Sequence, residues 1–297
     1  MREETSENPF QSLTVRNLSL KFLILTIALA ISLIPLGPLV SQLSSQALTL
    51  LIYILQFTLV CLWVLVDFKK RNIKLKHIIG LMPPNYPWLP MLGLVILILL
   101  FSLSAYLITF SLVSLMAPDF ISQLLQQLSE RSNPNTSTPL LFTVLQAIAY
   151  IIVAPITEEF LFRGYILQRW ASKWSMTVAL VASSILFGVL HANIIGLSMF
   201  GLVMGVLYIR TRTLLIPIAC HAFNNLIAFS LQMLSTKPKV IDASTQLQEL
   251  RSGWWVGVIL MLISLPLLVR FLKKQFPSAN LQIPYLTNLY LSINHEV

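Results

Sequence analysis

Residues 139–163 read PLLFTVLQAIAYIIVAPITEEFLFR, an apolar run that ends in two adjacent glutamates and an arginine. A run of about 20 apolar residues is long enough to cross a bilayer as a helix. Carboxylates are among the costliest side chains to place inside a membrane. The stretch therefore predicts a membrane-spanning helix in which Glu158 and Glu159 need a specific reason to be present.

The composition of the whole chain supports this reading. Of 297 residues, 56% are hydrophobic and only 10% are charged, whereas a soluble domain carries about a quarter charged residues. We therefore expect an integral, multi-pass membrane protein, surrounded by membrane lipids in the plasma membrane of a bacterium. The formal net charge of +9 is explained by basic cytoplasmic loops, so we expect no nucleic-acid partner.

The rule of about 20 apolar residues per span predicts an all-α, polytopic membrane helix bundle of about eight transmembrane helices. No soluble domain interrupts these segments, and the polar stretches 117–138 and 235–252 are predicted to be loops. The candidate spans are 20–40, 47–66, 88–116, 139–170, 175–195, 196–210, 213–234 and 253–272.

The positive charges of the loops predict the orientation. The stretch 67–77, DFKKRNIKLKH, is densely basic and is expected on the cytoplasmic side. With eight spans, the later basic clusters fall on that same side, and the uncharged turn 41–46 falls outside. The bundle is therefore predicted to have both termini inside (N-in/C-in). The later clusters are Arg169 with Lys173, Arg210 with Arg212, and Arg270 with Lys273 and Lys274.

Helix spacing separates the two glutamates. Glu159 and Arg163 lie four residues apart, on one face, where they can neutralise each other. Glu158 is turned by about 100° from Glu159, which leaves it without a local partner. Either Glu158 reaches the inner membrane interface, or it faces other polar residues within the bundle.

Two histidines lie in later spans, each with a neighbour on the same helical face. Phe187 precedes His191 by four residues, and His221 precedes Asn225 by four. Each histidine has a plain structural reading as a hydrogen-bonding residue between helices. The depths measured from the predicted turns nevertheless allow Glu158 to meet both histidines and Asn225 in one cluster.

Such a cluster has two possible chemistries. A carboxylate and an imidazole can deprotonate a shared water, while a second histidine and an asparagine donate hydrogen bonds to a developing oxyanion. Alternatively, Glu158, His191 and His221 could bind zinc and leave a position open for water.

The three motifs together resemble the CPBP (CAAX protease and bacteriocin-processing, Abi) family, and in particular its type II CAAX prenyl endopeptidases. These motifs are Glu158-Glu159-x-x-x-Arg163, Phe187-x-x-x-His191 and His221-x-x-x-Asn225. The resemblance implies an intramembrane endopeptidase that acts on a prenylated or membrane-tethered peptide.

By this resemblance, Glu158 and His191 activate the water, and His221 and Asn225 stabilise the oxyanion. Glu159, Arg163 and Phe187 would support the site. A glutamate mechanism without a cofactor is favoured over a zinc enzyme.

The resemblance also divides the chain into three parts. Residues 139–230 form the expected catalytic core, preceded by N-terminal helices and loops in 1–138. A final span and a short cytoplasmic tail follow in 231–297. The alternatives are a zinc-dependent form of the protease, or a non-catalytic membrane protein for immunity or partner binding. A transporter is disfavoured because no internal repeat is visible. The substrate and the oligomeric state do not follow from the sequence.

Overall fold

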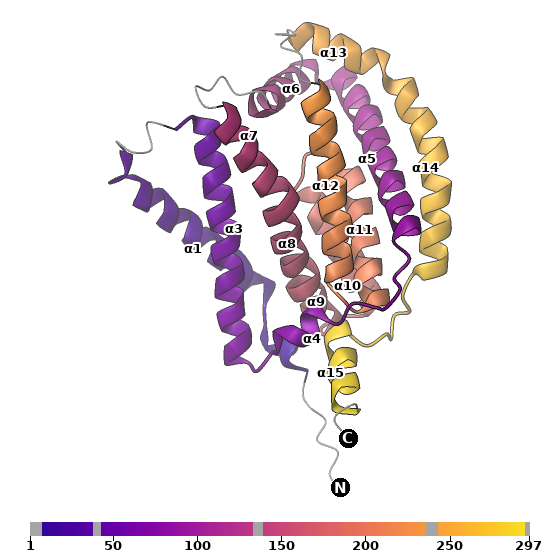
Figure 1. The fold of residues 1–297 in the computed structure, drawn as a ribbon. Coiled ribbons are helices and arrows are strands. Elements are labelled where there is room, and N and C mark those ends of the chain that lie inside the picture. Colours follow the sequence, from indigo (N-terminus) through magenta and orange to yellow (C-terminus); the bar gives the residue numbers. More distant parts are fainter. Residues whose placement is uncertain (1–7, 38–42, 133–138, 236–242, 295–297) are drawn as a thin grey trace.

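Helices make up all the regular structure in the described part of the computed structural model, which covers residues 8–37, 43–132, 139–235 and 243–294 (Figure 1). In chain order, the helices are η1 (Pro9–Ser12), α1 (Val15–Leu33), α3 (Ser45–Lys70), α4 (Leu75–Ile79), α5 (Trp88–Met116), α6 (Pro118–Ser132), α7 (Pro139–Ala147), η2 (Ile148–Val153), α8 (Ala154–Glu159), η3 (Phe160–Leu167), α9 (Gln168–Ala171), α10 (Met176–Val189), α11 (Ile194–Thr211), α12 (Leu215–Ser235), α13 (Ala243–Ser252), α14 (Trp254–Gln275) and α15 (Pro284–Asn294).

The predicted all-α polytopic bundle is confirmed. Within the described ranges, seven helical segments are long and apolar enough to cross a membrane. The predicted segment 175–195 corresponds to α10, which has 14 residues and is shorter than the others. The chain is therefore a multi-pass membrane protein whose helices run alternately up and down the bundle (Figure 1).

The first span is shifted from its predicted bounds of 20–40. Helix α1 begins at Val15, because the side chain of Thr14 accepts a hydrogen bond from the backbone of Asn17 and caps the first turn. It ends at Leu33, two residues before Pro35, which has no backbone N–H to continue the helical hydrogen bonds. The end of the predicted segment, beyond residue 37, lies outside the described residues.

The basic clusters used to predict orientation lie together at one end of the bundle. Arg210, near the end of α11, donates hydrogen bonds to the carbonyls of Gln275 and Phe276, which follow the lysines of α14. The backbone of Leu214 bonds to Ile79, next to the basic stretch 67–77. The first and the last described helices, η1 and α15, also lie at this end of the bundle (Figure 1). Which side of the membrane this end faces remains a prediction.

Two stretches predicted to be loops contain helices instead. Helices α6 and α13 lie across the end of the bundle opposite α15 (Figure 1). Their apolar residues Ile121, Leu125 and Leu250 are buried together with Phe110 of α5. Turn-forming residues alone predicted loops, but this amphipathic spacing allows a helix to bury one face.

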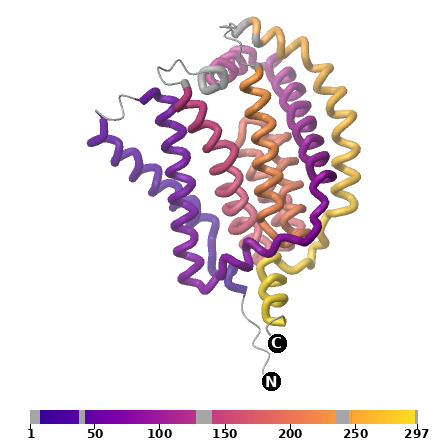
Figure 2. Tube along the Cα trace, viewed as in Figure 1, coloured from indigo at the N-terminus to yellow at the C-terminus, as the bar shows by residue number. Residues whose placement is uncertain are grey.

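The helices form two groups around the central α7–α9 segment. Helices α1 and α3 lie on one side and α5 and α14 on the other (Figure 2). Helix α12 packs against η2 and α8, and α11 packs against α10. The segment from α7 to α9 is one continuous helical path of five elements, two of which, η2 and η3, are π-helical.

Helices α10 and α11 form a hairpin whose turn adjoins the central helix. Helix α10 covers about 21 Å at 1.5 Å per residue, less than the roughly 30 Å of a hydrocarbon core. Two glycines allow close packing across the hairpin. A Cβ on Gly188 would lie 2.0 Å from Ser198 Oγ, and one on Gly201 would lie 3.1 Å from Ser184 Cα. The turn therefore places residues 190–193 beside the central helix.

Candidate active site

The two glutamates lie where the central helix changes between α- and π-helical turns. The π-helical η2 precedes the short α8, which ends at Glu159, and the π-helical η3 follows it. Pro155 in α8 cannot donate to the carbonyl four residues earlier. In membrane helices, local π-helical turns can re-satisfy the backbone groups that a proline frees, and π-helical turns are frequent at functional sites. Glu158 and Glu159 are consequently presented from a short, irregular stretch.

Glu158 faces the bundle interior with its two carboxylate oxygens in different environments. Oε1 accepts a hydrogen bond from the Tyr53 hydroxyl at 3.0 Å. Oε2 lies 3.9 Å from His191 Nε2. The residue is only 8% exposed, so it does not extend to the membrane interface, which was the other reading of the sequence.

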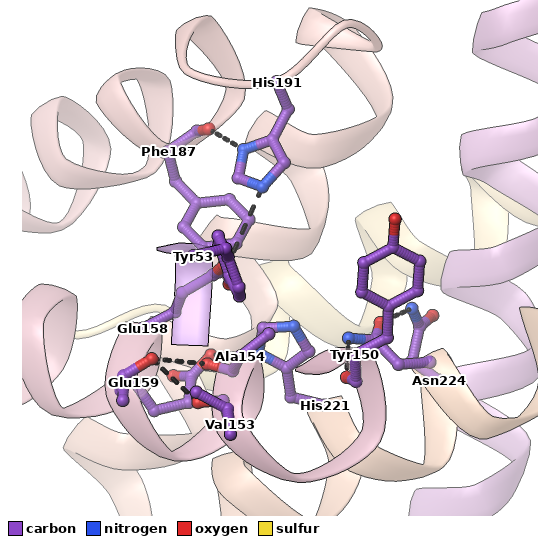
Figure 3. A network of polar contacts seen from close by, with 12 residues as sticks. Tyr53, Tyr150, Val153, Ala154, Glu158, Glu159, Phe187, His191, His221 and Asn224 are labelled. Carbon is purple, nitrogen blue, oxygen red and sulfur yellow. Dashed lines mark hydrogen bonds and ion pairs between the residues drawn. The ribbon is translucent and has the colours of Figure 1, made fainter. Parts of the chain in front are cut away.

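His191 lies in the turn after α10, not on the helix itself as the sequence suggested. Its Nδ1 is 2.6 Å from the carbonyl oxygen of Phe187. Because a carbonyl only accepts, Nδ1 carries the hydrogen, and Nε2 of the neutral ring is left with a lone pair directed towards Glu158 (Figure 3). The Phe187 ring stacks on the imidazole with centroids 4.5 Å apart, as the spacing predicted.

Glu159 pairs with Arg163 as predicted, at 3.0 Å between Oε1 and Nη1. The same oxygen is 2.9 Å from His221 Nδ1. The sequence placed His221 in one cluster with Glu158, and within that cluster its Nδ1 contacts the other glutamate. Only the tertiary packing of α12 on α8 decides which of two adjacent carboxylates the imidazole meets.

Arg163 is buried and anchors this second network. Its Nη2 donates to the carbonyl of Gly201 at 2.7 Å, and its guanidinium lies 5.1 Å from the centroid of the Phe187 ring. Phe187 thus contacts both the cation and the His191 ring. The predicted supporting residues form one connected unit behind the two histidines.

The Asn225 side chain is held beside the site by a hydrogen bond to the backbone of η2. Its Nδ2 donates to the carbonyl of Tyr150 in η2 at 2.8 Å, and its Oδ1 accepts from Asn224 at 3.1 Å. An amide nitrogen has two hydrogens, so the contact with Tyr150 uses one and leaves a second. The contact also ties α12 to the π-helical turn before the glutamates.

One cavity of about 1170 Å³ brings the four predicted catalytic residues together: Glu158, His191, His221 and Asn225 all line it. Much of the remaining wall is apolar and comes from helices outside the three motifs. That part includes Leu18 and Phe22 of α1, Leu50 and Phe57 of α3, and Phe142 of α7. The predicted convergence is therefore present, beside a large apolar space.

The alternative zinc ligands are not assembled into a ligand group. Among the described residues, no group of three or more His, Cys, Asp or Glu side chains is placed to hold a metal ion. Nδ1 of His221 contacts Glu159 and Nδ1 of His191 contacts the Phe187 carbonyl, so the Nε2 atom of each ring is free. Zinc binding by Glu158, His191 and His221 stays a prediction.

The sequence did not identify Tyr53 as part of the site. It lies in α3, whose residues were read only as a hydrophobic span, yet its hydroxyl contacts Glu158. The position of Tyr53 in the sequence was a signal that could have been used, because aromatic residues that anchor a span are concentrated at its two ends. Tyr53 lies inside the apolar run, where its hydroxyl requires a partner.

Comparison with known proteins connects this site to a described family. Residues 140–227 match the family model "Type II CAAX prenyl endopeptidase Rce1-like". The resemblance inferred from the three motifs is thereby confirmed over this region, which contains the four predicted catalytic residues.

Two curated relatives match parts of the chain. "Putative membrane peptidase YdiL" of Bacillus subtilis (strain 168) is 30% identical over 131 residues, which are 41% of this chain and 53% of the relative. "Uncharacterized 24.3 kDa protein" of Escherichia coli is 34% identical over 86 residues, covering 26% and 40%. The chain thus spans about half or less of the length of these relatives. No solved structure matches the chain.

Proposed function

We propose that this protein is an intramembrane endopeptidase that hydrolyses a peptide bond in a prenylated or membrane-tethered substrate, using a water activated by Glu158 and His191. One observation carries the proposal: Glu158 Oε2 and His191 Nε2 lie 3.9 Å apart in a shared cavity. This separation is too long for a direct hydrogen bond, and a water can bridge polar groups at such a distance.

The two acceptors would orient this water for attack. The Phe187 carbonyl holds the hydrogen on Nδ1, so both Nε2 and Oε2 can accept. A water that donates one hydrogen to each directs its lone pairs away from both. When its oxygen attacks the substrate carbonyl, one proton passes to this pair, which acts as the general base.

His221 and Asn225 are the proposed donors to the oxyanion. The doubly protonated His221 ring would keep Nδ1 on Glu159 and donate from Nε2, while Asn225 would use the amide hydrogen not bonded to Tyr150. Collapse of the tetrahedral intermediate breaks the C–N bond. The proton held by Glu158 and His191 then passes to the leaving amine, and the acyl product is released as a carboxylic acid.

The apolar wall of the cavity supports a substrate that carries a lipid or an apolar segment. Leu18, Phe22, Leu50, Phe57 and Phe142 adjoin the polar groups in one space. We propose that membrane lipids surround the helices. The matched relatives come from bacteria, which supports a bacterial plasma membrane, with the basic end of the bundle in the cytoplasm.

We propose the glutamate mechanism, with no cofactor, over the zinc-dependent alternative. The supporting observation is that, among the described residues, no three His, Cys, Asp or Glu side chains are grouped so as to hold a metal ion. A chelator should therefore leave the rate unchanged. Loss of activity with a chelator, restored by zinc, would replace this mechanism with the metal-dependent one.

The test uses the full chain reconstituted in phosphatidylethanolamine–phosphatidylglycerol vesicles with a quenched fluorogenic farnesylated CAAX peptide. Loss of a general base lowers rates by about 10²–10⁴-fold. We expect this loss in Glu158→Ala and in His191→Ala, with melting temperatures near that of the unmutated protein. Glu249→Ala, an exposed carboxylate on α13, is the matched control and should retain the full rate.

Full activity in Glu158→Ala would refute the proposed mechanism. A wild-type protein that cleaves neither the farnesylated peptide nor an unprenylated transmembrane peptide would favour the non-catalytic reading, in which the same fold binds a partner. In that case, a cellular phenotype that survives Glu158→Ala would support immunity or partner binding.

A further inference from the structure

Tyr53 reaches the Glu158 carboxylate from a helix outside the family match and the three motifs. Its hydroxyl donates to Oε1 at 3.0 Å from the interior of α3. Its ring lies 4.6 Å from the Phe57 ring, one turn further along the helix. Tyr53 also packs against a small buried cluster that includes Leu50 and Phe142. These contacts hold the hydroxyl in one place beside Glu158.

The hydrogen bond from Tyr53 distinguishes the two carboxylate oxygens of Glu158. Oε1 is bonded to Tyr53, which leaves Oε2 for the side that faces His191 (Figure 3). The terminal torsion of a glutamate is broad, so without an external partner the carboxylate can rotate away from the imidazole. A hydrogen bond to an ionised carboxylate is also charge-assisted and strong.

We infer that Tyr53 is a positioning residue that keeps Glu158 ionised with Oε2 turned towards His191. This inference rests on the proposed function of Glu158 as a base. It extends the working site from the matched region to α3, so the N-terminal half of the bundle contributes to the chemistry as well as to the apolar cavity wall.

Other titratable groups surround Glu158 from every neighbouring element. Within the described residues, none of these other groups is hydrogen-bonded to the Glu158 side chain. The Tyr53 hydroxyl is the hydrogen-bond donor to that carboxylate. The other groups are Cys61 of α3, Tyr150 of η2, Glu159 of α8, Arg163 of η3, His191 of the α10–α11 turn and His221 of α12.

The first test compares two variants that each remove one tyrosine hydroxyl. In Tyr53→Phe, we expect kcat/KM for the farnesylated peptide to fall about tenfold to a hundredfold, mainly through kcat. Removing a hydrogen bond from the charged carboxylate makes its ionisation less favourable. The acidic limb of the pH–rate profile should therefore move up by about one pH unit.

Tyr106→Phe is the matched control. Tyr106 stacks on Phe110 of α5 with ring centroids 4.3 Å apart, which repeats the geometry of Tyr53 and Phe57. Tyr106 does not line the cavity. This variant should keep the kcat/KM and the pH profile of the wild-type protein.

The second test needs no turnover. N,N′-dicyclohexylcarbodiimide adds to protonated carboxyl groups in apolar surroundings, and mass spectrometry can quantify the adduct at residue 158. Labelling should increase as pH falls, and its midpoint should lie about one pH unit higher in Tyr53→Phe than in the wild-type protein or Tyr106→Phe. This readout reports the protonation of Glu158 directly.

The outcomes separate this inference from the proposed function. If the wild-type protein cleaves and Tyr53→Phe matches Tyr106→Phe in rate, pH profile and labelling, the role of Tyr53 is overturned and the function stands. A slower Tyr53→Phe with unchanged pH profile and labelling also overturns it, because that pattern indicates only a packing role. If the wild-type protein does not cleave, the proposed function fails, and the labelling midpoint alone still decides whether Tyr53 stabilises the ionised carboxylate.

Discussion

Removal of the Glu159 carboxylate should destabilise the protein more than most single substitutions. Glu159 is fully buried, and its Oε1 contacts both Arg163, at 3.0 Å, and His221, at 2.9 Å. In Glu159→Ala, the Arg163 guanidinium keeps its bond to the Gly201 carbonyl but loses its counter-ion in a site where it is 3% exposed. The cost arises mainly from this unpaired buried charge.

The magnitude follows from the burial of the pair. Breaking a buried ion pair by removing one partner costs about 3–5 kcal/mol. For a chain of this size, that loss corresponds to a fall in melting temperature of about 6–20 °C. Arg163→Met should cost a similar amount. The double variant should be less destabilised than the sum of the two, because no unpaired charge is left.

The two cysteines provide the assay. Cys61 and Cys220 are free thiols, partly or fully buried within the bundle. A thiol-reactive dye that fluoresces on coupling will therefore report unfolding as detergent-solubilised protein is heated. Glu249→Ala on α13, which removes an exposed carboxylate, is the control and should melt with the wild-type protein.

The same variant tests a second consequence of the structure. The sequence assigned Glu159 a supporting role, and its contact with His221 predicts that Glu159→Ala loses activity as well as stability. A wild-type melting temperature in Glu159→Ala would refute the buried ion-pair reasoning. A melting temperature lowered as expected, with full activity below it, would refute the proposed support of His221 by Glu159.

Three further predictions concern the hairpin, the end of the bundle and the orientation. Gly188→Ala should lower stability by about 1–3 kcal/mol and reduce cleavage, because its Cβ would meet Ser198 and displace the turn that holds His191; an unchanged dye melt and rate would contradict this close packing. Arg251→Ala should lower the melting temperature by a few degrees, since Arg251 hydrogen-bonds Ser114 and ties α13 to α5; cleavage measured well below that temperature should be unchanged. Lys273→Cys should be protected from a membrane-impermeant maleimide in intact cells and labelled after lysis, whereas labelling in intact cells would reverse the predicted orientation.

Part of the site could be predicted because it depends on helix geometry alone. Glu159 with Arg163, and Phe187 with His191, are each four residues apart, and the structure shows both contacts. Phe187 and His191 remain in contact although α10 ends at Val189, because the first residues after a helix still follow the direction of its last turn. The catalytic roles of Glu158, His191, His221 and Asn225 remain predictions, although all four line one cavity.

Other parts could not be predicted from local patterns. Helices α6 and α13 were missed because each has a polar composition, and a packing partner is needed to explain its apolar face. The short α10 was predicted as a full span because residues 190–195 are also mostly apolar. Asn193 interrupts that run by capping α11, with its side chain accepting from the backbone of Gly196.

The sequence by itself determined that this chain is a multi-pass helical membrane protein, because composition and apolar run length depend on no long-range contact. It also determined that Glu159 and Arg163 are paired, because helical periodicity places them on one face. Only the tertiary structure decided that His221 bonds to Glu159, that Tyr53 bonds to Glu158, and that His191 lies in a turn beside Glu158. These contacts join residues 62, 105 and 33 positions apart, and they depend on how whole helices pack around two π-helical turns.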